Sequence, residues 1–231
     1  MIFLPNRRQQ WNGNNGNLKF KMQSLKLTKP WFKPIRFKGD RVSYIAPSWE
    51  EMGSLVFILA KKILASQKKF DRLITMAKGG WTWSRTLADY LEIEEVGSIQ
   101  VKFYSGIFAT KTTPVIIQSL PTPIVGERLL VFDDVADSGE TLIAVKKYLQ
   151  LCGSKSIATA ALFYKSWTKF IPSFYGDKTK SWIIFPHEIR ETINLLSQKW
   201  QRQGVLKKEV KSRLIKLGLA KNQVDYFYKK L

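Results

Sequence analysis

The chain is short of cysteine, because Cys152 is the only one among its 231 residues. A single thiol excludes a disulfide within the chain and is typical of a reducing compartment. Cys152 stands beside Gly153 at the expected end of a helix, which favours a packing role over a catalytic one. We therefore expect a cytoplasmic protein that folds without a cross-link.

Long apolar runs are also missing. The longest one in the first half of the chain, residues 55–60, ends at Lys61 and Lys62 and is far shorter than the roughly 20 residues that span a bilayer. Apolar residues nevertheless make up 45% of the chain, which excludes a disordered chain and allows a sizeable core. The length suits one ordinary domain with appendages, or two small domains.

Acidic residues are scarce. There are 18 Asp and Glu against 38 Lys and Arg, so the formal net charge is +20. Such a surplus attracts polyanions, among them nucleotides, pyrophosphates, nucleic acid and anionic lipid, and it does not choose among them. A lysine-rich surface that serves solubility explains the charge equally well.

The charge divides the chain into three parts. Residues 1–40 carry nine Lys or Arg and one acid, which predicts a basic N-terminal extension. A transit peptide and a start at Met22 remain open as alternatives for this segment. The main domain is expected over residues 41–200, and residues 201–231 form a basic tail of two short amphipathic helices broken at Gly218.

Helical spacing and apolar runs alternate along the main domain. Helices are expected at 49–67, where Ser48 and Glu51 match a capping box, and at 83–91, 141–151 and 188–200. Strands are expected at 72–77, 96–103, 128–132, 157–164 and 181–185. This alternation predicts an α/β fold with a mostly parallel sheet flanked by helices. The stretch 104–126 is expected to be a long functional or mobile loop.

The segment 128–141 (RLLVFDDVADSGET) indicates a phosphate site. Its loop follows an apolar strand, and open α/β sheets bind ligands at the carboxyl ends of their strands. The next helix offers free N–H groups and the positive end of its dipole. Gly139 lets the backbone approach an anion closely, and Ser138 and Thr141 add hydroxyl donors.

Two adjacent carboxylates, Asp133 and Asp134, precede this loop. They would repel a phosphate unless a cation or sugar hydroxyls lay between. A ribose diol can donate to both, and Mg²⁺ can bridge carboxylate and phosphate oxygens. The segment therefore predicts binding of a ribose phosphate.

Segment 128–141 resembles the signature of the type I phosphoribosyltransferases, D-D-x-x-D-[ST]-G-x-T between an apolar strand and an apolar helix. The resemblance covers roughly residues 45–195 and implies the fold of that family, with a mobile hood loop. It implies that Asp133 and Asp134 hold the ribose hydroxyls of phosphoribosyl pyrophosphate with Mg²⁺ nearby, and that both are metal-site residues. Asp137 would be the catalytic residue that exchanges a proton near N7 of the base.

The same resemblance implies that the backbone and side chains from Asp137 to Thr141 wrap the 5-phosphate. Glu140 is variable in the family, and a carboxylate there must point away from the phosphate. Lys78, Gly79 and Gly80 match the pyrophosphate loop, with Lys where relatives often have Arg. Tyr104 begins the hood loop, which in relatives closes over the site and excludes water.

The base-binding residues implied by the resemblance are Lys165, Trp182 and Ile183. A Lys only donates, so it suits the carbonyl at C6 of hypoxanthine, xanthine or guanine and not the amino group of adenine. Trp182 would stack on the ring, and Ile183 would offer main-chain groups. His187, the only histidine, stands where relatives have an aromatic residue, and we interpret it as a substitution at the rim of the pocket.

These residues predict an enzyme of purine salvage, closest to the xanthine and hypoxanthine(-guanine) phosphoribosyltransferases of bacteria and archaea. The partners would be phosphoribosyl pyrophosphate, Mg²⁺ and a 6-oxopurine, and relatives imply a homodimer or homotetramer. The alternative is a regulator of the same fold that binds phosphoribosyl pyrophosphate and nucleic acid, which the basic tails favour. Another acceptor base, orotate or adenine, is a third option.

Overall fold

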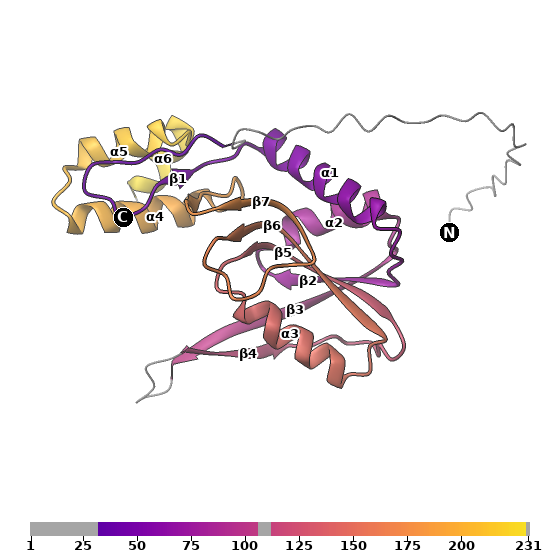
Figure 1. Cartoon of the computed structure of the whole chain (residues 1–231). Coiled ribbons are helices and arrows are strands. Elements are labelled where there is room, and N and C mark those ends of the chain that lie inside the picture. Colours follow the sequence, from indigo (N-terminus) through magenta and orange to yellow (C-terminus); the bar gives the residue numbers. More distant parts are fainter. Residues whose placement is uncertain (1–31, 106–111, 230–231) are drawn as a thin grey trace, which may run out of the picture. The chain divides into compact units, whose positions relative to one another are not determined.

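The computed structural model describes residues 32–105 and 112–229, without the side chains of residues 104, 105, 112 and 113 (Figure 1). Most of the expected N-terminal extension, residues 1–31, lies outside the described residues. Within the described ranges, no helix is long and apolar enough to cross a membrane.

A six-stranded sheet forms the centre of the fold. Its strands are β2 (Arg72–Ala77), β3 (Glu95–Ser105), β4 (Thr112–Gln118), β5 (Arg128–Ala136), β6 (Ser156–Lys165) and β7 (Phe174–Thr179). They lie in the order β4-β3-β2-β5-β6-β7, in which β4 pairs antiparallel with β3 and all other neighbours pair parallel. The expected α/β fold with a mostly parallel sheet is confirmed.

Helices cover both faces of this sheet. On one face lie α1 (Trp49–Ala65) and α2 (Trp81–Leu91), and on the other lies α3 (Glu140–Leu151) (Figure 1). Because side chains alternate along a strand, Leu130 packs into the core under α1 and α2, while Val131 packs into the core under α3. Both cores need apolar residues, which explains the continuous apolar runs of the strands.

The first helix begins where the capping box predicts. Ser48 Oγ accepts from the backbone N–H of Glu51 at 3.1 Å, and Glu51 Oε2 accepts from the N–H of Ser48 at 2.7 Å. Leu55, Leu59 and Ile63 follow at helical spacing and are buried against the sheet.

Two strands of the six-stranded sheet were not expected from the sequence. The predicted loop 104–126 contains β4, and β7 lies in a stretch for which no strand was predicted. Both are the edge strands of the sheet, so one side of each backbone carries no partner strand. Pro114 is tolerated in β4 because an edge strand can leave a backbone position without an N–H donor. Partial exposure also weakens the apolar signal along β7.

The N-terminal boundary differs from the expected one at residue 40. The compact unit begins at Phe32, whose side chain is buried in the main core, and Ile35 pairs with Tyr44. Asp40 is buried and forms an ion pair with Lys199 at 2.9 Å. The pairing partner of Asp40 is distant in sequence, so local composition could not reveal that residues 32–40 are packed.

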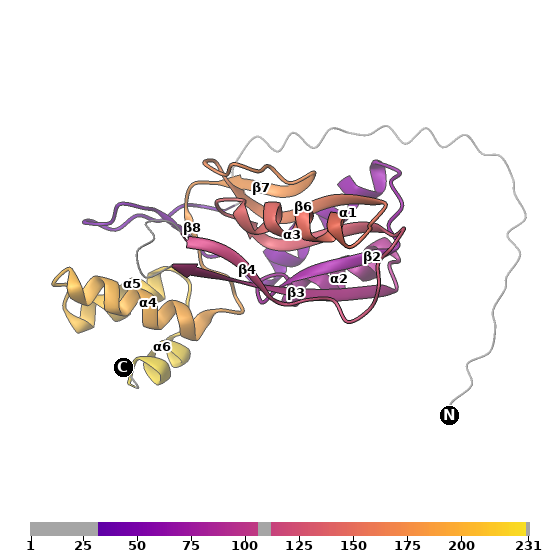
Figure 2. The same ribbon diagram turned by 90° about the horizontal axis from the view of Figure 1, so that it is seen from below.

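The C-terminal tail forms the two helices that were expected. α4 (Ile189–Arg202), α5 (Lys207–Lys216) and α6 (Lys221–Tyr228) pack together around a separate apolar cluster that includes Trp200 (Figure 2). Gly218 adopts a φ of 96° between α5 and α6, which is why the helical pattern breaks there. These helices belong to the same compact unit as the sheet.

A small parallel sheet joins this helical end to the rest. It pairs β1 (Tyr44–Ile45) with β8 (Trp182–Ile183). Only these two residues of the expected strand 181–185 are in strand conformation. The N–H of Trp182 donates to the carbonyl of Ser43 at 2.7 Å, so β1 determines where the Trp182 backbone lies.

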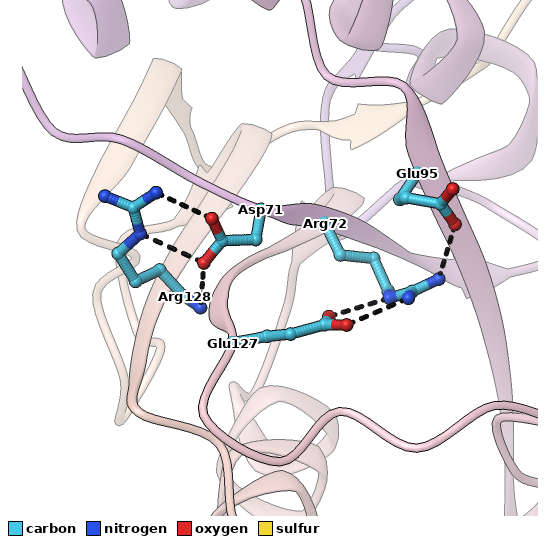
Figure 3. A network of polar contacts seen from close by, with 5 residues as sticks. All are labelled: Asp71, Arg72, Glu95, Glu127 and Arg128. Carbon is cyan, nitrogen blue, oxygen red and sulfur yellow. Dashed lines mark hydrogen bonds and ion pairs between the residues drawn. The ribbon is translucent and has the colours of Figure 1, made fainter.

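Charged pairs connect the amino ends of the central strands (Figure 3). Arg128 forms a 2.6 Å ion pair with Asp71, and Arg72 lies 2.8 Å from Glu127 and 3.0 Å from Glu95. These contacts hold β2, β3 and β5 in register at the end of the sheet where Arg72 begins its strand.

Candidate active site

A cavity of about 390 Å³ lies at the carboxyl ends of β2, β5 and β6. It is the place where parallel α/β sheets bind ligands. Eight of the predicted site residues line it, contributed by β5, β6 and β8, by the loops after β2 and β5, and by the start of α3: Gly79, Asp133, Asp134, Asp137, Thr141, Lys165, Trp182 and Ile183.

The other predicted residues surround this cavity or lie outside it. Lys78 is exposed and lines a neighbouring cavity of about 710 Å³, which shares Gly79, Glu188 and Glu191 with the first. Gly80 is buried at the start of α2. Tyr104 is the penultimate residue of β3, and its side chain is outside the described part of the chain.

The acid pair lies near the carboxyl end of β5, which continues to Ala136. Asp134 is 5% exposed, and Asp133 Oδ1 accepts from the backbone N–H of Asp134 at 2.9 Å. Burial raises the pKa of Asp134 to about 6, and burial together with the charge of Asp134 raises the pKa of Asp133 well above its usual value. Their negative charge is therefore poorly stabilised by the protein alone. Carboxylate oxygens in this state fit Mg²⁺ or a ribose diol.

The loop after β2 approaches the acid pair very closely. A Cβ atom on Gly79 would lie 2.5 Å from Oδ1 of Asp134, so only glycine fits without displacing this carboxylate. The Ala77–Lys78 peptide bond is cis. The loop and the acid pair thus form one surface, although 54 residues separate Gly79 from Asp133 along the chain.

The loop between β5 and α3 has the geometry of an anion site. Gly139 has a φ of 83° and precedes the helix, where the free N–H groups of the first turn lie. Ser138 Oγ accepts from the N–H of Glu140 at 3.3 Å, and the Ser138 carbonyl accepts from the N–H of Lys169 at 3.0 Å. Glu140 forms an ion pair with Lys169 at 3.2 Å. This pair partly neutralises the Glu140 carboxylate beside the proposed anion site.

The segment after β6 supports the site in a way that the sequence did not reveal. Trp167 Nε1 donates to Oδ1 of Asp137 at 2.7 Å. Lys165 Nζ lies 5.6 Å from the centre of the Trp167 ring, within the range of a cation–π interaction. Trp167 thus connects the side chains of Asp137 and Lys165. No motif marked it, because its role depends on the loop from another strand.

Lys165 is the predicted cationic residue that lines the cavity. It is the last residue of β6 and is 6% exposed, and its Nζ donates to the carbonyl of Ser181. Burial lowers the pKa of Lys165. The residue after Ser181 is Trp182, which is 46% exposed, while Ile183 beside it is buried. An ammonium group and an indole ring therefore lie along one wall of the cavity.

Three residues before and in the first turn of α4 also reach the site. Glu188 and Glu191 line the cavity, and His187 Nε2 lies 3.9 Å from Oδ2 of Asp134. Burial and the charges of Asp134 and Glu191 raise the pKa of Glu188 to about 7, and burial lowers the pKa of His187. The sequence predicted no site role for Glu188 or Glu191. Their position at the start of the predicted helix 188–200, shortly after Trp182, was the feature of the sequence that could have indicated one.

Comparison with known proteins gives concordant matches. The family described as phosphoribosyl transferase domain matches residues 48–191. The xanthine-guanine phosphoribosyltransferase of Gluconobacter oxydans is 23% identical over 147 residues, which cover 63% of this chain and 84% of that protein.

Solved structures give the same result. The purine phosphoribosyltransferase of Pyrococcus horikoshii is 31% identical with a TM-score of 0.56, over 62% of this chain and 93% of that one. The xanthine-guanine-hypoxanthine phosphoribosyltransferase of Helicobacter pylori is 25% identical with a TM-score of 0.56, over 67% of this chain and 99% of that one. Residues 48–191, which the family matches, include all the residues that line the 390 Å³ cavity.

Proposed function

Since the chain belongs to the phosphoribosyltransferase family, we propose that it transfers the 5-phosphoribosyl group of phosphoribosyl pyrophosphate to N9 of a 6-oxopurine. The products are a nucleoside monophosphate and pyrophosphate. Relatives named as purine enzymes support the acceptor class. Hypoxanthine, guanine and xanthine are the candidate bases, and purine salvage is the process that such a reaction serves.

The observation that carries the proposal is the placement of Lys165 beside Trp182. One of the three N–H groups of the Lys165 ammonium donates to Ser181, which leaves donors for a substrate. A purine stacked on the exposed indole of Trp182 would present its C6 substituent to this wall. A carbonyl accepts from an ammonium, whereas the amino group of adenine is a donor and would leave both groups unpaired.

The remaining residues match the other parts of phosphoribosyl pyrophosphate. The loop from Asp137 to Thr141 would bind the 5-phosphate through the N-terminus of α3. Asp133 and Asp134 would hold the ribose hydroxyls, and together they would hold Mg²⁺, which supplies charge neutralisation for the pyrophosphate when it is bound. Lys78 and the backbone at Gly79 and Gly80 would hold the leaving pyrophosphate.

Asp137 is the proposed proton-exchange group. As the C1′–oxygen bond breaks, its electron pair leaves with pyrophosphate while N9 of the base forms the new bond. The base loses one proton in this exchange, and Asp137 would accept or return a proton near N7. Trp167 orients its carboxylate by donating at 2.7 Å.

The test incubates the purified full chain with phosphoribosyl pyrophosphate, Mg²⁺ and each of five bases. Turnover with a 6-oxopurine and none with adenine or orotate is expected. Lys165→Ala should lower kcat/KM for hypoxanthine, guanine and xanthine by about 100-fold, which corresponds to roughly 3 kcal/mol for a lost hydrogen bond to a charged group. Unchanged values for all three would refute the 6-oxopurine assignment.

Asp137→Asn tests the proton role. Turnover should fall at least about 100-fold, because an amide cannot accept the proton, while the circular dichroism spectrum is unchanged. Wild-type turnover in this variant would eliminate the role. Absence of turnover by the wild type, combined with salt-dependent binding of RNA or DNA, would favour the regulator instead.

A further inference from the structure

Three potential metal ligands meet where the site adjoins α4. One ligand atom from each of Asp134, His187 and Glu188 lies within 4.8 Å of the other two. Asp134 comes from the end of β5, and His187 and Glu188 come from the turn before α4. Among the residues that the structure describes, this is the one group of His, Cys and acidic side chains so arranged.

His187 is the member that calls for an explanation. Both of its ring nitrogens are buried and have no hydrogen-bond partner. Its ring stacks on Phe185 at 5.3 Å and lies 6.4 Å from the ring of Trp49, and neither ring offers an acceptor in the imidazole plane. The 3.9 Å separation from Asp134 is too long for a hydrogen bond. A buried polar group without a hydrogen-bond partner is unfavourable, so a ligand for these nitrogens would stabilise the site.

The two acids beside His187 need a positive charge. The Asp134 side chain is 8% exposed, and its carboxyl repels that of Glu188. A metal ion bound at about 2.0–2.2 Å by nitrogen and oxygen ligands places those ligand atoms roughly 3.5 Å apart. The three side chains need to close by only about 1 Å to reach that separation, which is within the reach of small side-chain rotations.

We propose that Asp134, His187 and Glu188 form a binding site for a divalent transition-metal ion of the Zn²⁺ or Co²⁺ type. An imidazole nitrogen with two carboxylates suits these ions, whereas Mg²⁺ prefers oxygen ligands alone. The site shares Asp134 with the Mg²⁺ expected at Asp133 and Asp134, and it differs from that site in having an imidazole ligand. Three protein ligands leave a coordination position open, and Glu188 lines both adjoining cavities.

The site consists only of protein atoms, so it can be tested whether or not the proposed reaction occurs. The probes are ZnCl₂, CoCl₂ and MgCl₂ added to the untagged, metal-stripped full chain without phosphoribosyl pyrophosphate or purine. Calorimetry should show one Zn²⁺ per chain, bound at least about tenfold more tightly than Mg²⁺.

The chain contains a single histidine, which makes its spectroscopic signature unambiguous. Co²⁺ should shift or broaden the imidazole proton resonances of His187 in the NMR spectrum of the wild type. If saturating Co²⁺ neither shifts nor broadens the His187 resonances, the proposal is overturned. This measurement needs no variant.

His187→Phe is the matched variant, because it keeps a ring on Phe185 and removes both nitrogens. Its Zn²⁺ affinity should fall on the order of 100-fold, while Mg²⁺ binding changes little. Cys152→Ser, which removes the one thiol that could bind Zn²⁺ elsewhere, should retain wild-type affinity. Wild-type Zn²⁺ affinity in His187→Phe, or its loss in Cys152→Ser, would refute the site.

Discussion

The acidic side chains at the two ends of the central strands have opposite electrostatic surroundings. At the amino ends, Arg72 and Arg128 hold carboxylates at 2.6–3.0 Å (Figure 3). At the carboxyl ends, Asp133 and Asp134 lie side by side, Asp134 buried and Asp133 half-buried, and no Arg is among the described residues that line their cavity. The hydrogen bonds from Arg128 lower the pKa of Asp71, while burial raises the pKa of Asp134 to about 6.

This difference separates stability from activity. The ion pairs at the amino ends need no ligand to be stabilising, and they connect β2, β3 and β5. The neighbouring acids at the carboxyl ends repel each other, and a bound cation or sugar hydroxyls would stabilise them. Substitutions at the carboxyl ends should therefore change turnover most, and substitutions at the amino ends should change unfolding most.

The largest effect is expected for Gly79→Ala at the carboxyl ends. The new Cβ would lie 2.5 Å from Asp134 Oδ1, so the carboxylate must move, and a misplacement of about 1 Å can cost about 100-fold in rate. Steady-state kinetics with phosphoribosyl pyrophosphate and the best base measures it. Gly53→Ala in α1, where the new Cβ meets nothing within 4 Å, is the control and should keep full turnover. Equal turnover in the two variants would contradict the role of Asp134.

Arg72→Met tests whether the ion pairs at the amino ends stabilise the fold without affecting turnover. It leaves Glu127 and Glu95 without their shared partner, which should lower the free energy of unfolding by about 1–3 kcal/mol. Urea unfolding measures this, and kcat should stay within about twofold of the wild type. Arg85→Met, which breaks an exposed pair with Asp89, should cost less than about 1 kcal/mol. A large loss of kcat in Arg72→Met would show that the two ends are not separate.

Trp167→Phe should have a smaller effect at the carboxyl ends. It removes the N–H that donates to Asp137 and keeps an aromatic ring beside Lys165, so kcat should fall by no more than about tenfold. Trp81→Phe removes an indole donor of the same 2.7 Å length, in this case to Ser98, and should leave kcat unchanged. If both variants behave alike, the Trp167 bond does not position Asp137.

Asp71→Asn should show the smallest effect, through its dependence on pH. The pKa of Asp71 is lowered in the folded state, so its stabilisation is present above about pH 4 and is lost as the pH falls through the folded-state pKa. The variant should melt below the wild type at pH 7, and the difference between the two melting temperatures should narrow below about pH 4. Calorimetric scans from pH 7 to pH 2.5 would reveal it, and a constant gap would exclude charge as its cause.

Local sequence patterns predicted the interior of the fold well. The capping box at Ser48, the apolar strand 72–77 and the two helices around Gly218 all lie where their patterns indicate. Edge strands β4 and β7 were not predicted, since an edge strand needs neither a continuous apolar run nor every backbone donor. The packing of residues 32–40 was also beyond reach, because Asp40 meets Lys199 only after folding.

The order of the motifs, and the chemistry that each can perform, can be read from the amino-acid sequence. Strand, paired acids, glycine loop and helix follow one another within residues 128–141, where short-range spacing is enough to bring them together. Three relations in the site come from the folded chain instead: Gly79 lies against Asp134, Trp167 donates to Asp137, and His187 faces an acid with both of its nitrogens unpaired. Those relations depend on contacts between strands and loops distant in sequence, which arise from the packing of the whole sheet.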